Sequence, residues 1–382
     1  MYDPVEAARG LRGRIMEAAP LIEQERQLPA SLVDDMREAG LFHMTIPQSL
    51  AGLEANPVAA ARAVEEIAYA DGSAAWCVML AAQSTGFAGL LPEEEARTVF
   101  GSGGIMAGTA RPIGRAIPTH DPAEGYLVSG RWPFASGSSH ATWFLAECII
   151  YDGEQPRVDA QGNQVTRAVF VPREAVTIYD TWYTTGLRGT ASNDFSIENV
   201  FVPAARGFQT LVAEPLHPWV LYQFPQLIFM NHGSHALGIA QASLDATKDI
   251  VNMKKGWGDQ PLREVLRVQT VVAEATALIE SARQYLYAAA EELWEAAQTG
   301  VEDTRVLRSR VRLAASHAAT SSVRAMDLLH STMGTTAIFT YSPLERQFRD
   351  IHTAAAHVMI GPLTYQAAGR VELGMEPDFP FF

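Results

Sequence analysis

The spacing of apolar residues changes its period twice along the chain, and this change constrains the fold more than any other feature. Residues 1–103 repeat at the three-to-four spacing of helices, residues 104–205 form short β-rich runs between turn residues, and residues 206–382 return to the helical spacing. These segments predict an α+β protein, mostly α. We expect an N-terminal helical domain, a central antiparallel β-barrel or sandwich, and a C-terminal four-helix bundle.

The expected elements follow from apolar runs and from the residues that end them. An amphipathic run over residues 269–298 predicts a long helix that ends at Gly300. A second helix, capped by Asp303 or Thr304, should reach about residue 333, and a last helical stretch from Glu345 should bend at Gly361–Pro362. The expected strands are ATWFLAECIIY (141–151), TRAVFVP (166–172), VTIYDTWYTT (176–185) and DFSIENVFVP (194–203).

Composition excludes several classes of protein. The 382 residues carry a net charge of −14, and no run of Lys and Arg marks a nucleic-acid binder. Cys77 and Cys148 form no CxxC motif, which excludes a disulfide framework and favours a reduced, cytoplasmic compartment. The N-terminal segment lacks the apolar core of a secretory signal, and prolines, histidines and other polar residues in the charge-free segments 72–92, 215–244 and 351–369 argue against membrane spans.

Several cofactor motifs are absent from the sequence. It contains no GxGxxG, P-loop, HExxH or GxSxG, so neither a resident nicotinamide nor a phosphate-cradling loop is expected. His352 and His357 lie about 140° apart on a helix, which is poor geometry for one metal ion, and no metal site is predicted. If the chain is a redox enzyme, its reducing equivalents must therefore arrive on another carrier.

The segment SGRWPFASGSSHATW (129–143) reads as a strand that ends in a Ser/Gly turn. Phe134 and Ser136 are two residues apart, so on a strand they would share one face. Such a face would offer an aromatic ring beside a hydroxyl, which is the wall that a flat, π-rich cofactor needs.

Four motifs together, in this order, resemble the acyl-CoA dehydrogenase superfamily over nearly the whole chain. They are LPASLVDDMREAGLFHMTIPQSLAGLE near the start, SGRWPFASG, GLRGTASNDFSIENVFVP (186–203) and MGTTAIFTYSPLERQFRD (333–350). The resemblance implies an N-terminal helical domain (1–103), a central β-barrel (104–205) and a C-terminal four-helix bundle (206–382). It also implies a homotetramer that binds flavin between the barrel and the bundle.

The chain departs from the dehydrogenases at their catalytic glutamate. Arg349–Asp350 is followed by IHTAAAHVMIGPLTY, with Val358 near the glutamate position and no acid before Glu372. This departure and the basic loop GTARPIGRA (108–116) resemble the oxygenase components of two-component flavin monooxygenases, of the 4-hydroxyphenylacetate and secosteroid hydroxylase type. The resemblance implies reduced FMN, or reduced FAD, from a separate NAD(P)H:flavin reductase. It further implies a C4a-hydroperoxyflavin formed with O2, and hydroxylation of a small aromatic or polycyclic substrate such as a phenol.

The same resemblance assigns roles to individual residues. Ser136 would contact flavin N5, Phe134 would stack on the isoalloxazine, and Trp132 and Thr109 would add contacts. His357 would accept a phenol proton, as an imidazole can near neutral pH, whereas His352 would bond the flavin or a neighbouring helix. Lys254 and Trp257, in KKGWG, lie where the family binds the flavin diphosphate of a neighbouring subunit.

The charge-free segment 215–244 is expected to line the substrate pocket. Its apolar and polar candidates are Trp219, Tyr222, Phe224, Phe229 and Asn231, and Trp76 would close the pocket. Two alternatives remain open. One is an acyl-CoA dehydrogenase-like oxidoreductase whose base is displaced to Glu214 or Asp245, and the other is an inactive paralogue that serves as a binding subunit.

Overall fold

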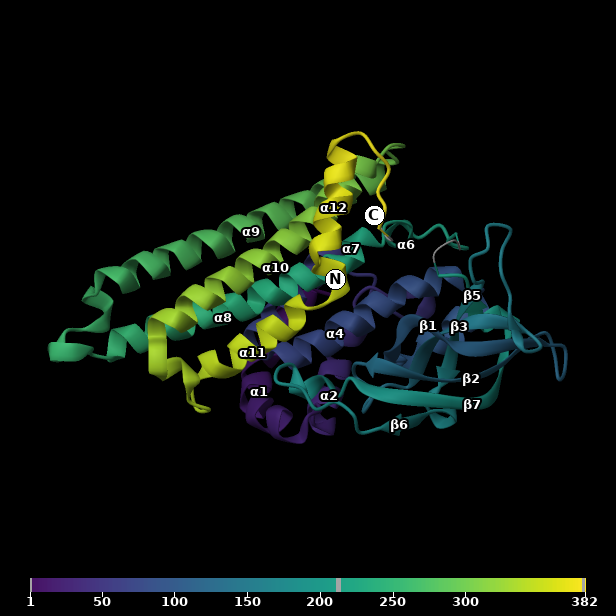
Figure 1. Cartoon of the computed structure of the whole chain (residues 1–382), viewed down its shortest axis with the longest axis horizontal. Coiled ribbons are helices and arrows are strands. Elements are labelled where there is room, and N and C mark those ends of the chain that lie inside the picture. Colours follow the sequence, from purple (N-terminus) through teal and green to yellow (C-terminus); the bar gives the residue numbers. More distant parts are fainter. Residues whose placement is uncertain (1, 211–213, 380–381) are drawn as a thin grey trace.

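A computed structural model gives the fold and describes residues 2–210, 214–379 and 382, apart from the side chains of residues 102 and 257. Long helices run side by side at one end of the molecule and the sheet lies at the other, with helix α4 between them (Figure 1). The arrangement puts the sheet margin against the bundle, and this junction is where the candidate site lies.

The N-terminal helices begin at residues that cap them. Asp3 and Asn56 accept backbone N–H bonds at the starts of α1 and α3, each followed by a proline, and Asp71 accepts from Ala74 at the start of α4. The helices are α1 (Pro4–Glu25), α2 (Ala30–Glu38), α3 (Pro57–Ala70), α4 (Gly72–Ser84) and α5 (Glu93–Phe100). Helix α4 is apolar on nearly every side, and most of its residues are buried in the interior of the molecule.

The sheet corrects the expected topology. It comprises β1 (Met106–Thr119), β2 (Gly125–Ala135), β3 (Trp143–Asp152), β4 (Gln155–Pro156), β5 (Thr166–Pro172), β6 (Thr177–Tyr179), β7 (Asn193–Pro203) and β8 (Gly207–Phe208). The order is β6-β7-β2-β1-β3-β5-β8, with β4 on β3, so the described strands form an open sheet that is not closed into a barrel. The pair β1–β3 is parallel, and β3 lies on the side of β1 opposite its antiparallel partner β2.

The C-terminal helices follow the predicted pattern with one difference. They are α6 (Val220–Gln223), α7 (Gln226–Phe229), α8 (Asn231–Met253), α9 (Leu266–Thr299), α10 (Arg305–Met333), α11 (Pro343–Ala355) and α12 (Pro362–Glu372). Gly300 ends α9 in the left-handed conformation, as expected. The expected bend is a full break between α11 and α12, which holds the short 3-10 turn Val358–Ile360. His357 lies in this break.

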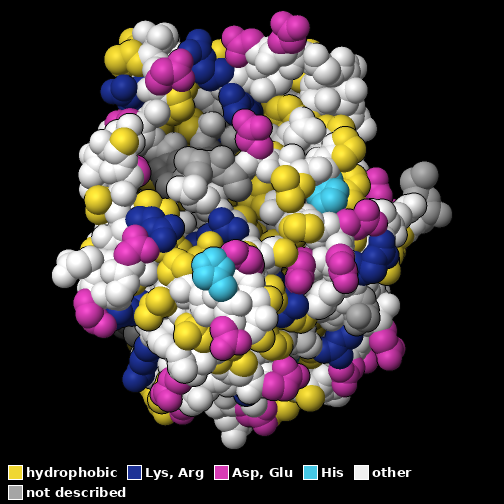
Figure 2. All heavy atoms as spheres, turned by 90° about the vertical axis from the view of Figure 1, so that its right-hand side faces the viewer, with side chains coloured by type: hydrophobic (Ala, Val, Ile, Leu, Met, Phe, Trp, Pro, Cys, Tyr) yellow, Lys and Arg dark blue, Asp and Glu magenta, His cyan; other side chains and the backbone are white. Residues whose placement is uncertain are grey.

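The surface shows no single dominant charge on the face over the sheet. Acidic and basic side chains are interspersed there (Figure 2). None of the helices in the described ranges is both long and apolar enough to cross a bilayer.

Candidate active site

The indole of Trp76, on α4, joins the sheet to the bundle. Trp76 is 7% exposed, and its Nε1 donates a hydrogen bond to Ser136 Oγ at 3.2 Å. On its other side the ring packs edge-on against three imidazoles, with centroid distances of 5.4 Å to His232, 5.2 Å to His235 and 5.6 Å to His357. Three residues that the sequence proposed separately, Trp76, Ser136 and His357, therefore meet.

A chain of hydroxyls extends from Ser136, and its direction can be worked out. Thr190 donates its hydrogen to the Leu187 carbonyl, so at the 2.7 Å contact Ser192 must donate to Thr190. Ser192 then has no hydrogen left, so at 2.6 Å Ser136 donates to Ser192. Because Trp76 donates to Ser136, one lone pair of Ser136 Oγ remains, and Ser136 can only accept from a ligand.

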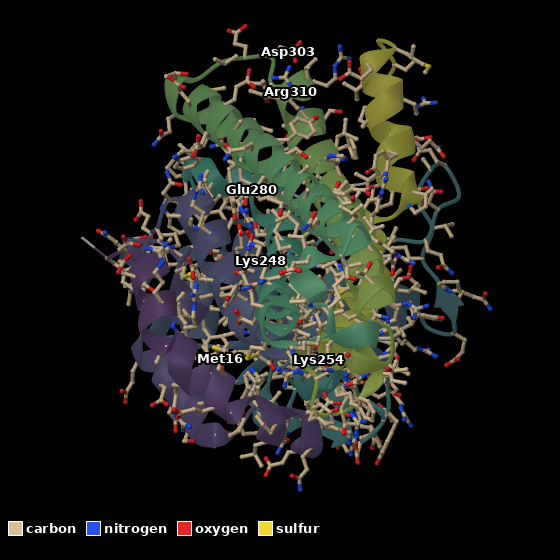
Figure 3. All side chains as sticks on the ribbon, turned by 90° about the vertical axis from the view of Figure 1, so that its left-hand side faces the viewer. Met16, Lys248, Lys254, Glu280, Asp303 and Arg310 are labelled. Atoms are coloured by element: carbon tan, nitrogen blue, oxygen red, sulfur yellow. The ribbon has the colours of Figure 1, made fainter. Side chains whose placement is uncertain are left out.

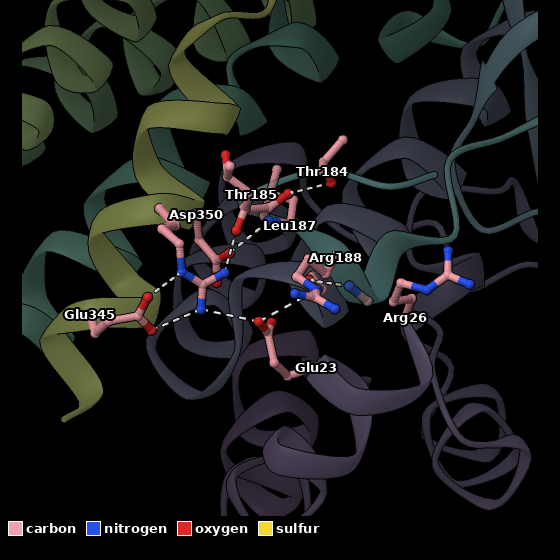
Figure 4. Close-up of polar contacts among 12 residues, drawn as sticks. Glu23, Arg26, Thr184, Thr185, Leu187, Arg188, Glu345 and Asp350 are labelled. Atoms are coloured by element: carbon pink, nitrogen blue, oxygen red, sulfur yellow. Dashed lines mark hydrogen bonds and ion pairs between the residues drawn. The ribbon is translucent and has the colours of Figure 1, made fainter. Parts of the chain in front are cut away.

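The segment that carries this chain is fixed to α11 and α1 by polar contacts (Figure 4). Asp350, which is buried, accepts a 2.6 Å hydrogen bond from Leu187 N. Arg349 makes a two-pronged ion pair with Glu345, a 3.0 Å contact with Glu23, and a hydrogen bond to the carbonyl of Thr185. These bonds hold the positions of the hydroxyls three to seven residues further on.

His357 caps the short turn between α11 and α12. Its Nδ1 accepts a long hydrogen bond of 3.4 Å from Met359 N, and its ring stacks on His232 at 4.4 Å. Burial, assisted by the charge of Arg312, lowers the pKa of His357 to about 4, so the imidazole is neutral at pH 7. The neutral tautomer that keeps the bond to Met359 carries its hydrogen on Nε2.

His232 and His235 add unpaired nitrogens to the same interior. His235 Nε2 bonds the Gly72 carbonyl at 2.8 Å, but no described residue pairs with His235 Nδ1 or with either ring nitrogen of His232. Burial is the main cause that lowers the pKa of both residues, to about 4 for His235. Buried nitrogens without partners are costly unless a ligand or water completes them.

Two of the expected flavin contacts lie elsewhere than predicted. Phe134 and Ser136 do not share a face, because Phe134 adopts φ 68° at the end of β2 and Ser136 follows the strand in a turn. The Phe134 ring is 52% exposed and stands edge-on to Trp182, while Ser136 is buried. Trp132 is fully buried in the sheet core, stacked on Phe195 with its Nε1 bonded to the Glu147 carbonyl, so it presents no surface to a cofactor.

The remaining cofactor candidates are separated in space. Thr109 is half-buried on β1, opposite Ala146 of β3. Lys254 ends α8 and bonds Thr336 at 2.9 Å, far from the sheet at the free end of the bundle (Figures 1 and 3). Within one chain Lys254 cannot reach a flavin at Ser136, so its expected role requires another subunit. Trp257 begins a short 3-10 turn, and its side chain lies outside the described part of the structure.

Two of the expected substrate residues, Tyr222 and Phe229, line a cavity of about 560 Å³. Tyr222 is anchored through its hydroxyl to the Thr45 carbonyl at 3.0 Å. Trp219 stacks on His217, Phe224 packs against the helical core, and Asn231 is buried at the start of α8. These three do not line the cavity.

The displaced bases proposed for a dehydrogenase are not at the site. Glu214 is exposed, and Asp245 bonds Tyr69, Gln241 and Lys248 on the flank of the bundle. His352 bonds the Phe348 carbonyl and Asp327 of α10, so it contacts a neighbouring helix. Among the described residues, no cluster of His, Cys, Asp and Glu could hold a metal ion.

Sequence reasoning missed Thr190, Ser192 and Arg312. Thr190 and Ser192 lie inside the family motif GLRGTASNDF, so the motif was a usable signal, but it does not reveal contact with Ser136. Arg312 is fully buried on α10, a position that no spacing marks.

The site fits a reduced flavin in its donor and acceptor pattern. Ser136 offers an acceptor lone pair, which is what the N5–H of a reduced flavin requires, and Phe134 presents an exposed ring near the same loop. No acid lies between Asp350 and Glu372, so the site has no counterpart of the carboxylate base expected there in dehydrogenases.

Comparison with known proteins places the fold in a family. Residues 6–92 match the model of the acyl-CoA dehydrogenase N-terminal domain, and residues 230–362 match that of the acyl-CoA dehydrogenase C-terminal domain. The chain belongs to the acyl-CoA dehydrogenase superfamily, as the motifs predicted.

Within that superfamily the similar proteins are monooxygenases. The chain is 29% identical to an indole-3-acetate monooxygenase of Pseudomonas putida, over 93% of this chain and 90% of the relative. It is 27% identical to an FADH2-dependent resorcinol hydroxylase, oxygenase component, of Rhizobium sp., over 96% and 93%. The structure of XiaF from Streptomyces sp. in complex with FADH2 and glycerol superimposes with a TM-score of 0.89 at 23% identity, over 99% of this chain and 96% of that one. The expected likeness to the oxygenase branch is confirmed.

Proposed function

We propose that this chain is the oxygenase component of a two-component flavin monooxygenase that hydroxylates a small aromatic or polycyclic substrate, such as a phenol. The observation that carries the proposal is the junction at Trp76, where an acceptor hydroxyl from the sheet margin and neutral imidazoles from the bundle converge without a carboxylate base. A reduced flavin supplies two electrons to O2 when bound. One oxygen atom is inserted into a C–H bond of the substrate. The other oxygen atom takes up the two hydrogens of the reduced flavin and is released as water.

Ser136 orients the cofactor in this proposal. Its hydrogen is committed to Ser192, so Oγ accepts from the flavin N5–H, and the Trp76 N–H keeps the serine from rotating. The buried setting also excludes water from the reacting atoms.

His357 positions the substrate oxygen. Neutral at pH 7, it offers Nε2 to a hydroxyl of the substrate. In the tautomer that keeps the hydrogen bond from Met359 N to His357 Nδ1, the ring hydrogen is on Nε2, so Nε2 donates to the substrate. For Nε2 to accept a phenol proton, the ring hydrogen must be on Nδ1 instead, and the 3.4 Å hydrogen bond from Met359 N is then lost. The bond is long, so its loss costs little.

Further parts of the proposal concern partners and assembly. We propose that a separate NAD(P)H:flavin reductase supplies reduced FMN or FAD, that the oxygenase is a cytoplasmic homotetramer, and that Lys254 and Trp257 serve a neighbouring subunit. The position of Lys254 at the end of α8, away from the sheet (Figure 1), supports this use of a second copy.

The test is anaerobic addition of reduced FMN or FAD to the purified chain, followed by an O2 pulse with a panel of phenols and indoles. We expect a transient absorbance before flavin reoxidation, and a hydroxylated product. Ser136→Ala should shorten the transient and release peroxide, whereas Ser139→Ala, an exposed hydroxyl three residues away, should leave both unchanged. A chain that purifies with FAD and is bleached by an acyl-CoA thioester would instead be a dehydrogenase-like oxidoreductase. Failure to bind any flavin would indicate a binding subunit.

A further inference from the structure

Arg312 is a buried cation without an anion. It is 0% exposed on α10, and its described hydrogen bonds both run from Nη2 to Met359, to the carbonyl at 3.0 Å and to the sulfur at 4.0 Å. Its Nε and Nη1 have no partner among the described residues, and burial alone lowers its pKa to about 10. A buried charge of this kind destabilises a fold unless an opposite charge is supplied.

The residues around Arg312 leave its in-plane nitrogens for a ligand. Aromatic rings of Phe229 and Phe382 lie 5.7 Å and 5.8 Å from its Cζ, and both residues line the 560 Å³ cavity. A guanidinium donates hydrogen bonds in its plane and packs against rings with its faces. Arg312 therefore stands directly behind an aromatic wall of the cavity.

A second arginine, Arg308, lines the cavity one helical turn before Arg312. Its Nε is buried and also has no partner in the described structure. The cavity has one acidic lining residue, Asp378, which accepts a 2.6 Å hydrogen bond from Gln366 and lies near Arg370. The unneutralised charge beside this cavity is thus positive, although the chain as a whole carries −14.

The same arginine faces the proposed reaction centre. Arg312 Nη2 donates to the carbonyl of Met359, whose own N–H donates to His357 Nδ1, and His357 stacks on His232, so the guanidinium lies close to the two stacked imidazoles. A ligand held by Arg312 would therefore have its other end within reach of these rings.

We propose that Arg312, assisted by Arg308, binds the carboxylate of the substrate, and that the substrate class is an aromatic acid. The proposal rests on the proposed function, because it assigns the substrate of the same site. The aromatic part packs against Phe229, and the carboxylate takes the in-plane positions at Nε and Nη1. Its entry requires a small movement of the ring of Phe229 or Phe382.

The test compares ligands that share a ring and differ in charge. Binding of indole-3-acetate and indole-3-acetamide, and of 4-hydroxyphenylacetate and 4-hydroxyphenylacetamide, is measured by equilibrium dialysis on the full chain, with and without anaerobic reduced FMN. The wild type should prefer each acid to its amide by at least about tenfold, the range of a hydrogen bond to a charged group. Arg312→Met should remove that preference while changing amide binding less than about threefold.

Controls separate this role from a structural one. Arg310→Met removes an arginine of the same helix that pairs with Glu292 on the outer face of the bundle (Figure 3), and it should leave both ligands unaffected. Equal loss of acid and amide binding in Arg312→Met would make Arg312 a structural cap of the Met359 carbonyl and overturn the proposal. A wild type that binds acid and amide equally would overturn it without any variant.

The outcome is distinguishable from failure of the proposed function. Acid-selective binding that depends on Arg312, without any hydroxylated product, would keep the anion site and reject the monooxygenase. If the chain binds the acid and the amide with equal affinity and hydroxylates both, the proposed monooxygenase function stands and the proposed anion site is rejected.

Discussion

The direction of the hydroxyl chain makes a prediction about which oxidation state of flavin the site prefers. Ser192→Ala removes the acceptor of the Ser136 hydrogen, which then rotates freely and can donate to a ligand. Oxidised flavin has an acceptor at N5 and reduced flavin has a donor, so the substitution should favour the oxidised form. One neutral hydrogen bond gained or lost is worth about 1 kcal/mol, which is about fivefold in a dissociation constant.

The assay is a pair of titrations, one with oxidised FMN in air and one with reduced FMN under argon. The ratio of the two dissociation constants should shift about fivefold toward oxidised FMN in Ser192→Ala. Ser138→Ala is the matched control, because it removes a buried hydroxyl of the same loop that donates to the Ala191 carbonyl. An unchanged ratio in Ser192→Ala, or an equal shift in Ser138→Ala, would refute the assigned direction.

Three further predictions follow from the same contacts. His357→Gln should lower coupled hydroxylation at least about tenfold, whereas His352→Asn should not. In the wild type, coupled hydroxylation should stay level from pH 8 to pH 6 and fall only as the pH approaches 4, where His357 becomes charged. A loss centred near pH 6.5 would contradict this assignment. The pKa of His235 is about 4 in the folded state and about 6.5 in the unfolded state, so the free energy of unfolding should decrease as the pH falls through this window. Between pH 7 and pH 5, urea unfolding should show a decrease in this free energy that is about 2 kcal/mol smaller in His235→Asn than in the wild type. Arg349→Met should lower the free energy of unfolding by about 1 kcal/mol, since Arg349 is partly exposed, while Arg305→Met, which breaks an exposed pair with Glu376, should change it by less than about 0.5 kcal/mol; equal effects of the two would show that the contacts of Arg349 add nothing.

The sequence by itself determined the order of helical, β and helical segments, because the period of apolar residues is a local property that each segment carries alone. Gly300 at the end of α9 shows this, since a left-handed residue ends a helix wherever the helix lies. The family motifs also pointed to Ser136 and His357, and the charge pattern placed a substrate pocket in a segment where Tyr222 and Phe229 do line a cavity.

Only the tertiary structure decided which distant residues meet. Alternation of apolar residues along a strand does not show which strands will pair or in which direction. The sequence therefore did not predict that β3 pairs parallel to β1 or that the described strands form an open, mixed sheet. A positive φ at Phe134, absent from any two-residue periodicity, turned that ring away from Ser136. The hydroxyl chain through Ser192 and the unpaired charge of Arg312 depend on contacts between elements dozens of residues apart, and such contacts exist only once the helices and the sheet have packed together.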